Sequence, residues 1–258
     1  MTQAPPQAQS QLPQVIAEWE ARSRVIKRLL RYLTILDSDP SILIRQGSIR
    51  IEELSPFHTE LLAVDVGGVK TYAAGGFTLS RDDATRLAKA MPSGYYDTRL
   101  IVSQGKLTIA NGYGGSAIAE AALAPLDWQE SLVDRLRLSH KASYIMSTQA
   151  ALTLTKPFTA LPDSHVKFTF SLHGIMLTAS ADDISIIANA SEAAMRGIEV
   201  NRVFNATYNV KSLVRFLEVA SGGNVGTVEV RATPDGPLET AVDEGWFTVR
   251  LFIAPAVD

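Results

Sequence analysis

Cysteine is absent from the 258-residue chain, and histidine occurs only four times. Without cysteine, the chain has no disulfide framework and no thiolate zinc site. Metal-binding spacing is also lacking among the histidines, which are His58, His140, His165 and His173. No run approaches the roughly 20 apolar residues of a membrane span, and the amino-terminal stretch has neither the charged nor the apolar region of a signal peptide. We therefore expect a soluble, intracellular protein without a metal.

Motifs of enzyme chemistry are equally scarce. The sequence has no Gly-x-Ser-x-Gly elbow, and Asn111 to Gly115 lacks the lysine and the following Ser or Thr of a phosphate-binding loop. The acidic pairs Asp37/Asp39 and Asp182/Asp183 fall where turns are expected, and aspartate is common in turns without any metal. We therefore predict no catalytic residue, no metal ligand and no cofactor. A duplicated β-rich enzyme domain is the less favoured alternative, and it would require a pocket with convergent polar groups.

The chain does contain a pattern that occurs twice. Thr207 lies half of the 258-residue chain after Thr78, and the two segments then match without a gap through Arg86 and Arg215 to Thr98 and Thr227. Each copy has a short apolar strand, a polar cap, a helix of about three turns and an alternating strand. Self-similarity over this length indicates a repeated unit. The chain is long enough for each of two similar domains to bury its own core.

The domain boundaries follow from composition. Residues 1–14 are rich in Gln, Pro and Ala and predict a disordered tail. The first domain is predicted over residues 15–122 and the second over residues 138–258. Residues 123–137 between them read as a linker, because Pro125 disfavours a helix and Leu126 and Trp128 are isolated apolar residues there.

Hydrophobic periodicity supplies the elements of each domain. The expected helices cover residues 23–37, 80–91, 148–160 and 209–220, with Ser80 and Asn209 as polar caps. In the first half, strands are expected at residues 15–19, 42–44, 49–53, 58–65, 70–75, 99–103, 106–111 and 116–122. In the second half, they are expected at residues 142–146, 166–171, 175–179, 184–190, 204–208, 226–232 and 247–253. This order predicts an α+β fold of two similar domains, each with two helices packed on antiparallel sheets.

Two short motifs and the order of the elements carry a resemblance to a known family. Phe252-Ile253-Ala254-Pro255 resembles the family's Tyr-Leu-Ala-Pro end, and the segment from Ile51 to His58 is similar to a strand and loop of the family. From Val15 to Pro255 the chain resembles a sliding clamp of the proliferating cell nuclear antigen type, the two-domain DNA polymerase processivity factor. The resemblance implies the DNA-clamp (processivity) fold, a ring of several copies and no cofactor.

A clamp of this type holds double-stranded DNA without reading its sequence, and lysine and arginine suit that task because phosphate attraction is independent of the base. The net charge of −3 does not exclude such a role, because positive charge is concentrated in the predicted helices. Exposed helical lysines and arginines are also common as plain solvated surface. The residues that match the family's inward helices are Lys27, Arg28, Arg31, Arg86, Lys89, Lys141, Lys156, Lys211 and Arg215.

The resemblance also implies an apolar pocket in which partners insert a short peptide with aromatic anchors. Such partners would include a DNA polymerase, a clamp loader and other replication or repair proteins. Leu126 and Trp128 would alternatively do no more than pack the linker onto the sheet, and His58 would be a hydrogen-bonded loop residue. The pocket residues implied are Leu54, His58, Leu126, Trp128, Pro237, Phe252 and Pro255.

A third implied site is the contact between copies. Two domains cannot surround a duplex, so a ring requires copies joined head to tail through a heterologous interface that closes. The edge near residues 116–122 would pair with the edge near residues 184–190 of the next copy, which also removes the hazard of unpaired edges. The implied interface residues are Ser116, Ile118, Ala119, Ile184, Ile186 and Ile187.

Together these features predict a non-enzymatic sliding clamp, expected as a DNA-associated intracellular homotrimer that tethers replication proteins and does not bind membranes. The alternative is a clamp-fold processivity factor that acts as a monomer or as one subunit of a mixed ring. The mass of the assembly distinguishes the two.

Overall fold

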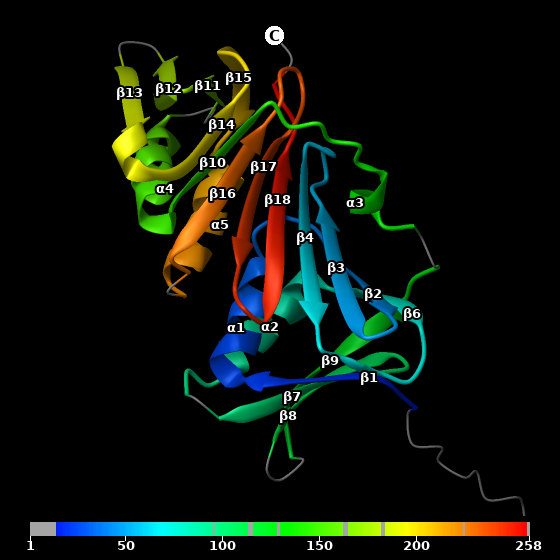
Figure 1. Ribbon diagram of the computed structural model, residues 1–258. Coiled ribbons are helices and arrows are strands. Elements are labelled where there is room, and N and C mark those ends of the chain that lie inside the picture. Colours follow the sequence, from blue (N-terminus) through cyan, green and yellow to red (C-terminus); the bar gives the residue numbers. More distant parts are fainter. Residues whose placement is uncertain are drawn as a thin grey trace, which may run out of the picture.

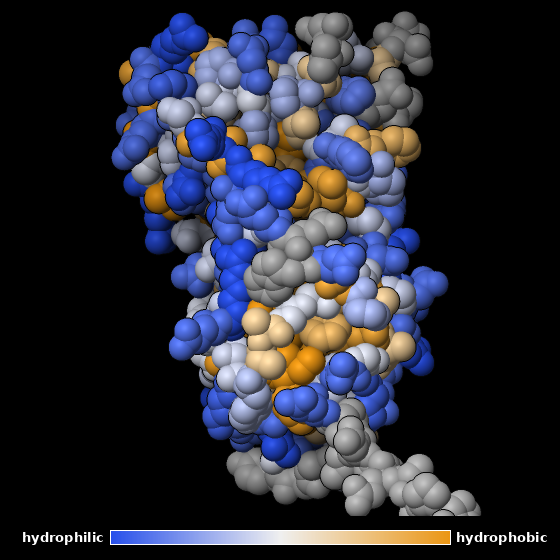
Figure 2. Space-filling model, turned by 90° about the vertical axis from the view of Figure 1, so that its right-hand side faces the viewer, coloured by the Kyte–Doolittle hydropathy of each residue, from blue (hydrophilic) through white to orange (hydrophobic). Residues whose placement is uncertain are grey.

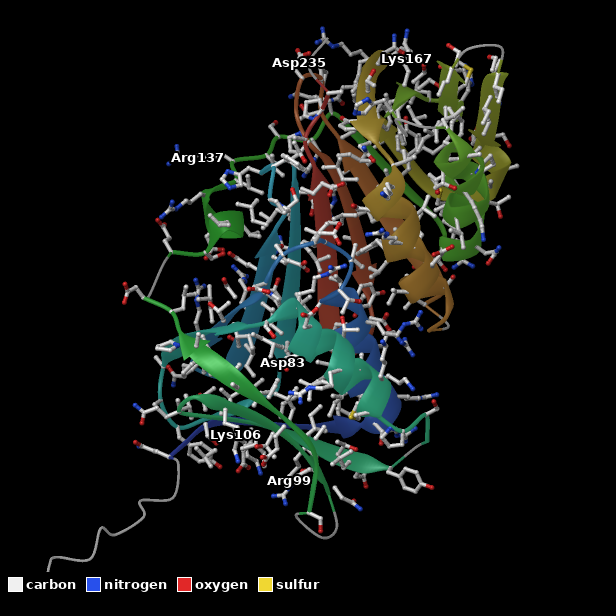
Figure 3. All side chains as sticks on the ribbon, turned by 180° about the vertical axis from the view of Figure 1, so that it is seen from behind. Asp83, Arg99, Lys106, Arg137, Lys167 and Asp235 are labelled. Carbon is white, nitrogen blue, oxygen red and sulfur yellow. The ribbon has the colours of Figure 1, made fainter. Side chains whose placement is uncertain are left out.

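A computed structural model describes residues 14–94, 96–112, 116–127, 130–161, 165–181, 184–223 and 225–256. Among the residues singled out above, Met1 to Pro13, Tyr113 to Gly115, Trp128, Asp182 and Asp183 lie outside these ranges. The described residues form an α+β fold with a 14-stranded sheet, a 4-stranded sheet and few helices. The long helices lie behind the sheets in Figure 1 and in front of them in Figure 3, so they share one face of the molecule.

The elements alternate along the chain much as the periodicity predicts. The first half contains β1 (Val15–Arg22), α1 (Ser23–Tyr32), β2 (Ser41–Arg45), β3 (Ser48–Leu54), β4 (Glu60–Gly67), β5 (Lys70–Thr71), β6 (Gly75–Leu79), α2 (Arg81–Ala90), β7 (Asp97–Ser103), β8 (Lys106–Asn111) and β9 (Ala117–Pro125). The short helix α3 (Leu132–Arg135) follows. The second half contains β10 (Ala142–Ser147), α4 (Thr148–Thr155), η1 (Lys156–Ala160), β11 (His165–Ser171), β12 (Gly174–Ala181), β13 (Ile184–Ser191), η2 (Glu192–Ala194), β14 (Met195–Val200), β15 (Phe204–Asn209), α5 (Lys211–Ser221), β16 (Thr227–Ala232), β17 (Leu238–Asp243) and β18 (Phe247–Ile253).

The helices bury the apolar stripes that predicted them. Ser80 accepts a hydrogen bond from the backbone N–H of Asp83 and so caps α2. Asn209 lies one residue further out than expected, and it accepts a hydrogen bond from the backbone N–H of Lys211 at 3.0 Å. The first predicted helix is too long: α1 ends at Tyr32, and hydrogen bonds that span three residues replace the α-helical pattern, as in Ile35 N–H to Tyr32 O.

Some elements escaped the sequence patterns. Strand β17 lies between β16 and β18 in the 14-stranded sheet and carries Glu239 at a buried position, where the side chain pairs with Arg231 and His140. A buried acidic residue breaks the apolar alternation that marks a strand. The strand β14 and the four-residue helix α3 are also additional, and β9 continues to Pro125, so it overlaps the predicted linker at residues 123–137.

The repeat is present in the topology of the two halves. The strand order β9-β8-β7-β1-β5 in the first half corresponds to β18-β17-β16-β10-β14 in the second, and β4-β3-β2-β6 corresponds to β13-β12-β11-β15. The gapless alignment holds through the helices, where Leu87 and Phe216 are both fully buried. It is wrong by one residue at the next strand, because Asp97 pairs with the residue before α1 whereas Thr227 pairs with the residue before α4. Thr98 therefore corresponds to Val228.

The two halves share one sheet. Strand β4 pairs with β18 in antiparallel register from Glu60 opposite Ile253 to Val66 opposite Phe247. Behind this junction α1 packs against α2 and α5, and α5 packs against α4. The four longer helices therefore form one layer along the sheet (Figure 3). No helix among the described residues is both long and apolar enough to cross a membrane.

Candidate functional site

The face of the sheet opposite the long helices carries α3. Core-facing residues of β3 are Ile49 and Ile51, so Arg50, Glu52 and Leu54 point to the other side. There a small apolar cluster separate from the main core contains Leu61, Ala63, Val133 and Phe252, with Leu54, Leu132 and Leu138 packed against it. Figure 2 shows apolar surface gathered in two areas of the side of the molecule that carries α3.

A cavity of about 440 Å³ opens between α3 and the junction of the two halves. Its floor is formed by apolar residues of the sheet, its far side by the β16–β17 turn and the segment after β18, and its near side by α3. Polar groups line only parts of the rim. The lining residues are Leu54, His58, Thr59, Glu60, Leu61, Leu132, Arg135, Leu136, Asp235, Gly236, Pro237, Phe252, Ala254 and Pro255.

The structure brings together five of the residues implied for the partner pocket: Leu54, His58, Pro237, Phe252 and Pro255. Leu126 does not join them. It lines a neighbouring cavity of about 130 Å³ with Leu43, Glu52 and Glu130, because β6 holds it by a hydrogen bond from its N–H to Gly76 O. Trp128 lies outside the described residues.

Sequence reasoning missed the second wall of the pocket. Leu132 of α3 and Leu136, the residue directly after the helix, supply that wall, and their spacing of four residues was the available signal. Glu60 was missed as well: it lies on the rim, and burial raises its pKa, although Ser212 donates a hydrogen bond to it and Arg215 lies nearby. Glu60 is the first residue of β4, and its position depends on the pairing of β4 with β18, which no local pattern predicts.

The predicted DNA-facing cations lie on the helical face, with one exception. Lys141 precedes β10, at the opposite end of that strand from α4, so it does not lie on a helix as expected. Arg31, Lys89 and Lys211 are exposed on α1, α2 and α5. These three cations are available to a polyanion on this face.

Most of the remaining cations on this face already hold a protein partner. Lys27 Nζ donates to Met91 O at 3.0 Å, and Lys156 Nζ lies 3.6 Å from Glu218 Oε1. Arg86 pairs with Asp83, and Arg215 donates to Ile35 O. The carboxylates of Asp83 and Glu218 lower the attraction that the helical face offers to an anion, whereas the contacts with backbone carbonyls only fix the positions of their cations.

Arg28 is committed to a contact between the two halves. It pairs with Glu244 in the β17–β18 turn, and Tyr32 Oη donates to Glu244 Oε1 at 2.8 Å. Burial raises the pKa of Glu244, and burial together with this carboxylate raises the pKa of Tyr32. Arg28 therefore serves to hold α1 on the second half.

Among the sheet edges of the described residues are the two at which the contact between copies was expected. Strand β9 pairs with β8 up to Ala122, and only its last residues pair with β6. Strand β13 pairs with β12 alone. Of the implied interface residues, Ser116, Ile118, Ile184 and Ile187 are exposed, whereas Ala119 and Ile186 are half-buried against the core.

The helical face, the pocket and the edges contain no group of three or more potential metal ligands, a statement that covers the described residues only. The arrangement offers surfaces for binding: an apolar cavity, unpaired backbone edges and a few free cations.

Comparisons with known proteins place the fold. No family model matches the chain, and no curated protein matches it by sequence. Among solved structures, proliferating cell nuclear antigen (PCNA) from Entamoeba histolytica matches with a TM-score of 0.80 and 15% identity, over 95% of this chain and 100% of that one. A second match, titled as the C-terminal region of FEN-1 bound to A. fulgidus PCNA, has a TM-score of 0.78 and 16% identity, over 94% and 99%. The chain has the fold of PCNA sliding clamps.

Proposed function

We propose that this chain is a DNA sliding clamp, a non-enzymatic processivity factor whose copies close into a ring around duplex DNA. The observation that carries the proposal is the pair of unpaired edges, β9 and β13, on a chain with the PCNA fold. An open sheet edge of this length favours association with another strand. In a ring each copy contributes one β9 edge and one β13 edge, so every edge of these two kinds finds a partner.

The β4–β18 junction inside the chain indicates how two copies would pair with each other. Strand β4 corresponds to β13 and β18 to β9, so pairing β13 of one copy with β9 of the next repeats the β4–β18 contact. Transferring that register puts Ile186 of one copy opposite Ala119 of the next, the counterparts of Leu62 and Leu251. Leu62 and Leu251 are fully buried, whereas Ile186 and Ala119 are only half-buried. Ile186 and Ala119 are apolar residues at the margin of the core, and a neighbouring copy would bury them fully.

Three copies, and so six similar domains, are proposed for the ring. The helix layer α2-α1-α5-α4 would face the channel, where Arg31, Lys89 and Lys211 are free to attract phosphates. Since Arg28, Arg86 and Lys156 are paired with carboxylates, each contact with DNA is expected to be weak. Residence on DNA then comes from closure, because dissociation requires an interface to open.

The cavity beside α3 is proposed to bind short peptide segments of partners such as a DNA polymerase, a clamp loader and other replication or repair proteins. Support comes from its apolar floor, Leu61 and Phe252, and from its size. Deep apolar pockets of this kind bind a few anchoring side chains strongly. Replacement of Phe252 by alanine is expected to abolish binding of such a segment and to leave the ring intact. Loss of the ring instead would show that Phe252 serves assembly.

The proposed location of the protein is intracellular and on DNA, with no role at a membrane and no cofactor. The alternative is a clamp-fold factor that acts as a monomer or within a mixed ring. Light scattering over a concentration series distinguishes them. A mass near three times the 27.9 kDa chain supports the homotrimer, whereas a monomer at every concentration contradicts it.

A further inference from the structure

We infer that Arg50 and Asp134 are positioning residues of the partner pocket, and that they hold α3 in place as its wall before any partner binds. The inference rests on the proposed function, because it concerns how the proposed pocket is formed. One wall of the pocket is a single turn of helix in the segment between the two halves, and a peptide-binding site requires that wall to be held in a fixed position.

A helix of four residues is not stable by its own hydrogen bonds, because nucleation costs more than one turn returns. The local support of α3 among the described residues is slight: Ser131 Oγ accepts a hydrogen bond from the N–H of Asp134 at 3.3 Å, Leu136 N–H donates to Val133 O, and Arg135 forms an exposed ion pair with Glu130. Val133 is the single buried residue within the helix. The position of α3 must therefore depend on its attachment to the sheet.

The first attachment is made by Glu52 of β3, whose side chain is buried beneath α3. Its carboxylate accepts a hydrogen bond from the N–H of Leu132 at 2.8 Å and another from Ser131 Oγ. Ser131 is fully buried, so these bonds are shielded from water. A carboxylate at the first turn satisfies helix N–H groups and interacts favourably with the helix dipole.

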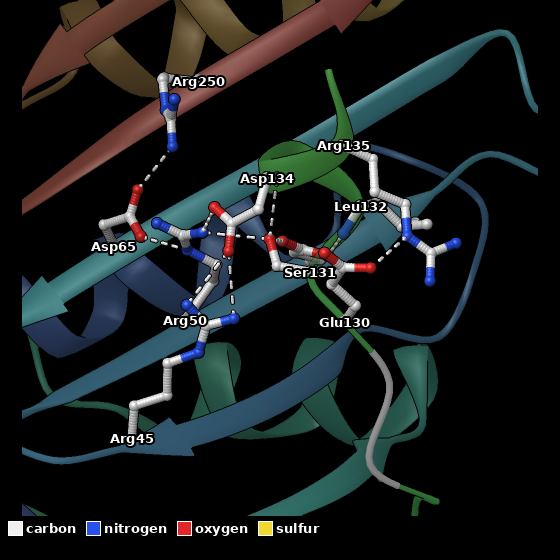
Figure 4. A network of polar contacts seen from close by, with 10 residues as sticks. Arg45, Arg50, Asp65, Glu130, Ser131, Leu132, Asp134, Arg135 and Arg250 are labelled. Carbon is white, nitrogen blue, oxygen red and sulfur yellow. Dashed lines mark hydrogen bonds and ion pairs between the residues drawn. The ribbon is translucent and has the colours of Figure 1, made fainter. Parts of the chain in front are cut away.

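The second attachment is made by two arginines that hold Asp134. Arg50 Nη1 donates to Asp134 Oδ1 at 2.5 Å and to Ser131 Oγ at 3.0 Å. Both terminal nitrogens of Arg45 donate to Asp134 Oδ2, at 3.1 and 3.2 Å. Figure 4 shows the two guanidinium groups converging on this carboxylate from β2 and β3. Although burial alone would raise it, these hydrogen bonds lower the pKa of Asp134.

Arg50 is itself fixed by the junction of the two halves. Its Nε donates to Asp65 Oδ1 at 2.5 Å, and Arg250 of β18 donates to the other oxygen of Asp65 at 2.9 Å (Figure 4). Because every anchor belongs to a paired strand, α3 is tied to a rigid support. Groups held in this way keep a binding site in its productive geometry.

The consequence is a pocket formed in advance. Leu132 of α3 and Leu136 directly after it line the pocket, so a partner that enters does not have to order that wall. If the attachment is lost and the wall is docked only a tenth to a fifth of the time, apparent affinity falls about fivefold to tenfold. The same loss leaves the sheet and its core untouched.

Hydrogen exchange on the free protein tests the attachment without any partner. The amides to follow are those of Leu132, Asp134 and Leu136, which donate to Glu52, Ser131 and Val133 O. In Asp134→Ala we expect them to exchange about tenfold faster, although alanine favours a helix. Glu130→Ala is the matched control, because it removes a carboxylate from the same segment whose ion pair within the described residues is the exposed one with Arg135 and not one with the sheet. Asp134→Glu, which keeps the charge, is expected to retain most of the protection.

Binding supplies the second readout. The probe is a peptide selected from a random display library for binding to the wild-type protein and not to Phe252→Ala. It should bind Asp134→Ala about fivefold to tenfold more weakly and Glu130→Ala as well as the wild type, with thermal stability and assembly mass unchanged. Unprotected α3 amides in the wild type, or equal or tighter binding by Asp134→Ala, would overturn the inference. Failure to select any such peptide would contradict the proposed pocket, even with α3 protected.

Discussion

The β4–β18 junction inside the chain and the free β9 and β13 edges are built on the same strand positions but carry different chemistry. At the junction, Asp65 bridges Arg250 and Arg50, and the guanidinium of Arg250 lies 5.8 Å from the ring centroid of Phe252. The counterparts of Asp65 and Arg250 on the edges are Asn189 and Ala117, which form no ion pair with each other. Strand β13 has no charged residue at all, and β9 has only Glu120.

This difference suits two kinds of contact. The junction combines a continuous core, the cover of α3 and a charge ladder, by which we mean the ion pairs of Asp65 with Arg50 and Arg250. It does not need to open. A contact between the edges would rest on backbone hydrogen bonds and small apolar residues, which can separate without leaving a buried charge unpaired. In the proposed ring, opening is therefore expected at the edges and never at the junction.

The largest effect is expected at the junction core. Leu251 is fully buried, so Leu251→Ala should lower the free energy of unfolding by about 2–5 kcal/mol through lost burial and the cavity left behind. Denaturant unfolding measures it. Ile186→Ala, at the counterpart of the facing Leu62, should weaken assembly more than folding. Equal losses of folding stability in both variants would contradict the distinction between junction and edge.

Charges on a free edge should break the ring. Ile184 and Ile187 are 58% and 70% exposed, so replacing both by lysine should spare the fold of a single copy. If a neighbouring copy covers them, losing both apolar contacts weakens assembly by about 100-fold or more. Light scattering would report monomers. The matched control replaces the equally exposed Tyr72 and Val203 by lysine, and dissociation in that protein would show that charge alone is responsible.

The next expected effect is a pH dependence of folding stability that arises in the first half and has no counterpart in the second. Burial raises the pKa of Glu53 to about 9, and its counterpart on β12 is the uncharged Ala179. The folded chain keeps this proton while the unfolded chain releases it above its normal pKa, so stability contributed by this group falls as pH rises from about 4.5 to 9.

Glu53→Gln should remove that fall. Between pH 5 and 8 we expect the wild type to lose on the order of 2 kcal/mol more stability than the variant. Denaturant unfolding at both pH values provides the comparison. Glu60 and Glu244, whose pKa values burial also raises, remain in both proteins and cancel. Parallel pH dependence in the two proteins would refute the assignment.

The smallest effect concerns the charge ladder. Arg250→Met keeps the contact with Phe252 and loses the ion pair with Asp65, which is only partly shielded from water. Because Arg50 still holds Asp65, the expected loss is about 0.5–1 kcal/mol. Thermal unfolding measures the loss of stability in Arg250→Met. The reference is the loss in Lys106→Met, which breaks the exposed ion pair with Glu120. A larger loss for Lys106→Met would mean that the ladder adds nothing.

Most of the fold could be predicted because many of its elements have a recognisable pattern within a short stretch of sequence. The stripe of α1, the cap at Ser80 and the alternation of β7 and β8 are all visible within a short window. The doubling of the pattern also made the two-part topology predictable. Boundaries were less certain, since a turn at Leu33 to Leu36 buries the same apolar side chains that a longer helix would.

The pocket was only partly predictable, because its wall depends on charges that are distant in sequence. Nothing near Asp134 indicates that Arg45 and Arg50 hold it. Leu126 was misplaced for a related reason: the end of β9 continues into the linker and draws that residue toward β6. Helices of a single turn and buried acids such as Glu239 are decided by tertiary partners, which no periodicity records.

The absence of cysteine gives the molecule a practical property. Every thiol in a variant of this chain is an introduced one, so thiol chemistry takes place only at the chosen positions. One cysteine at Ala119 and one at Ile186 lie on different edges of the same copy and, in the proposed register, meet only across copies. Opposed strand positions approach closely enough for a disulfide. Oxidation would then convert a ring of separate chains into a covalent circle, and a reducing agent would reopen it on demand.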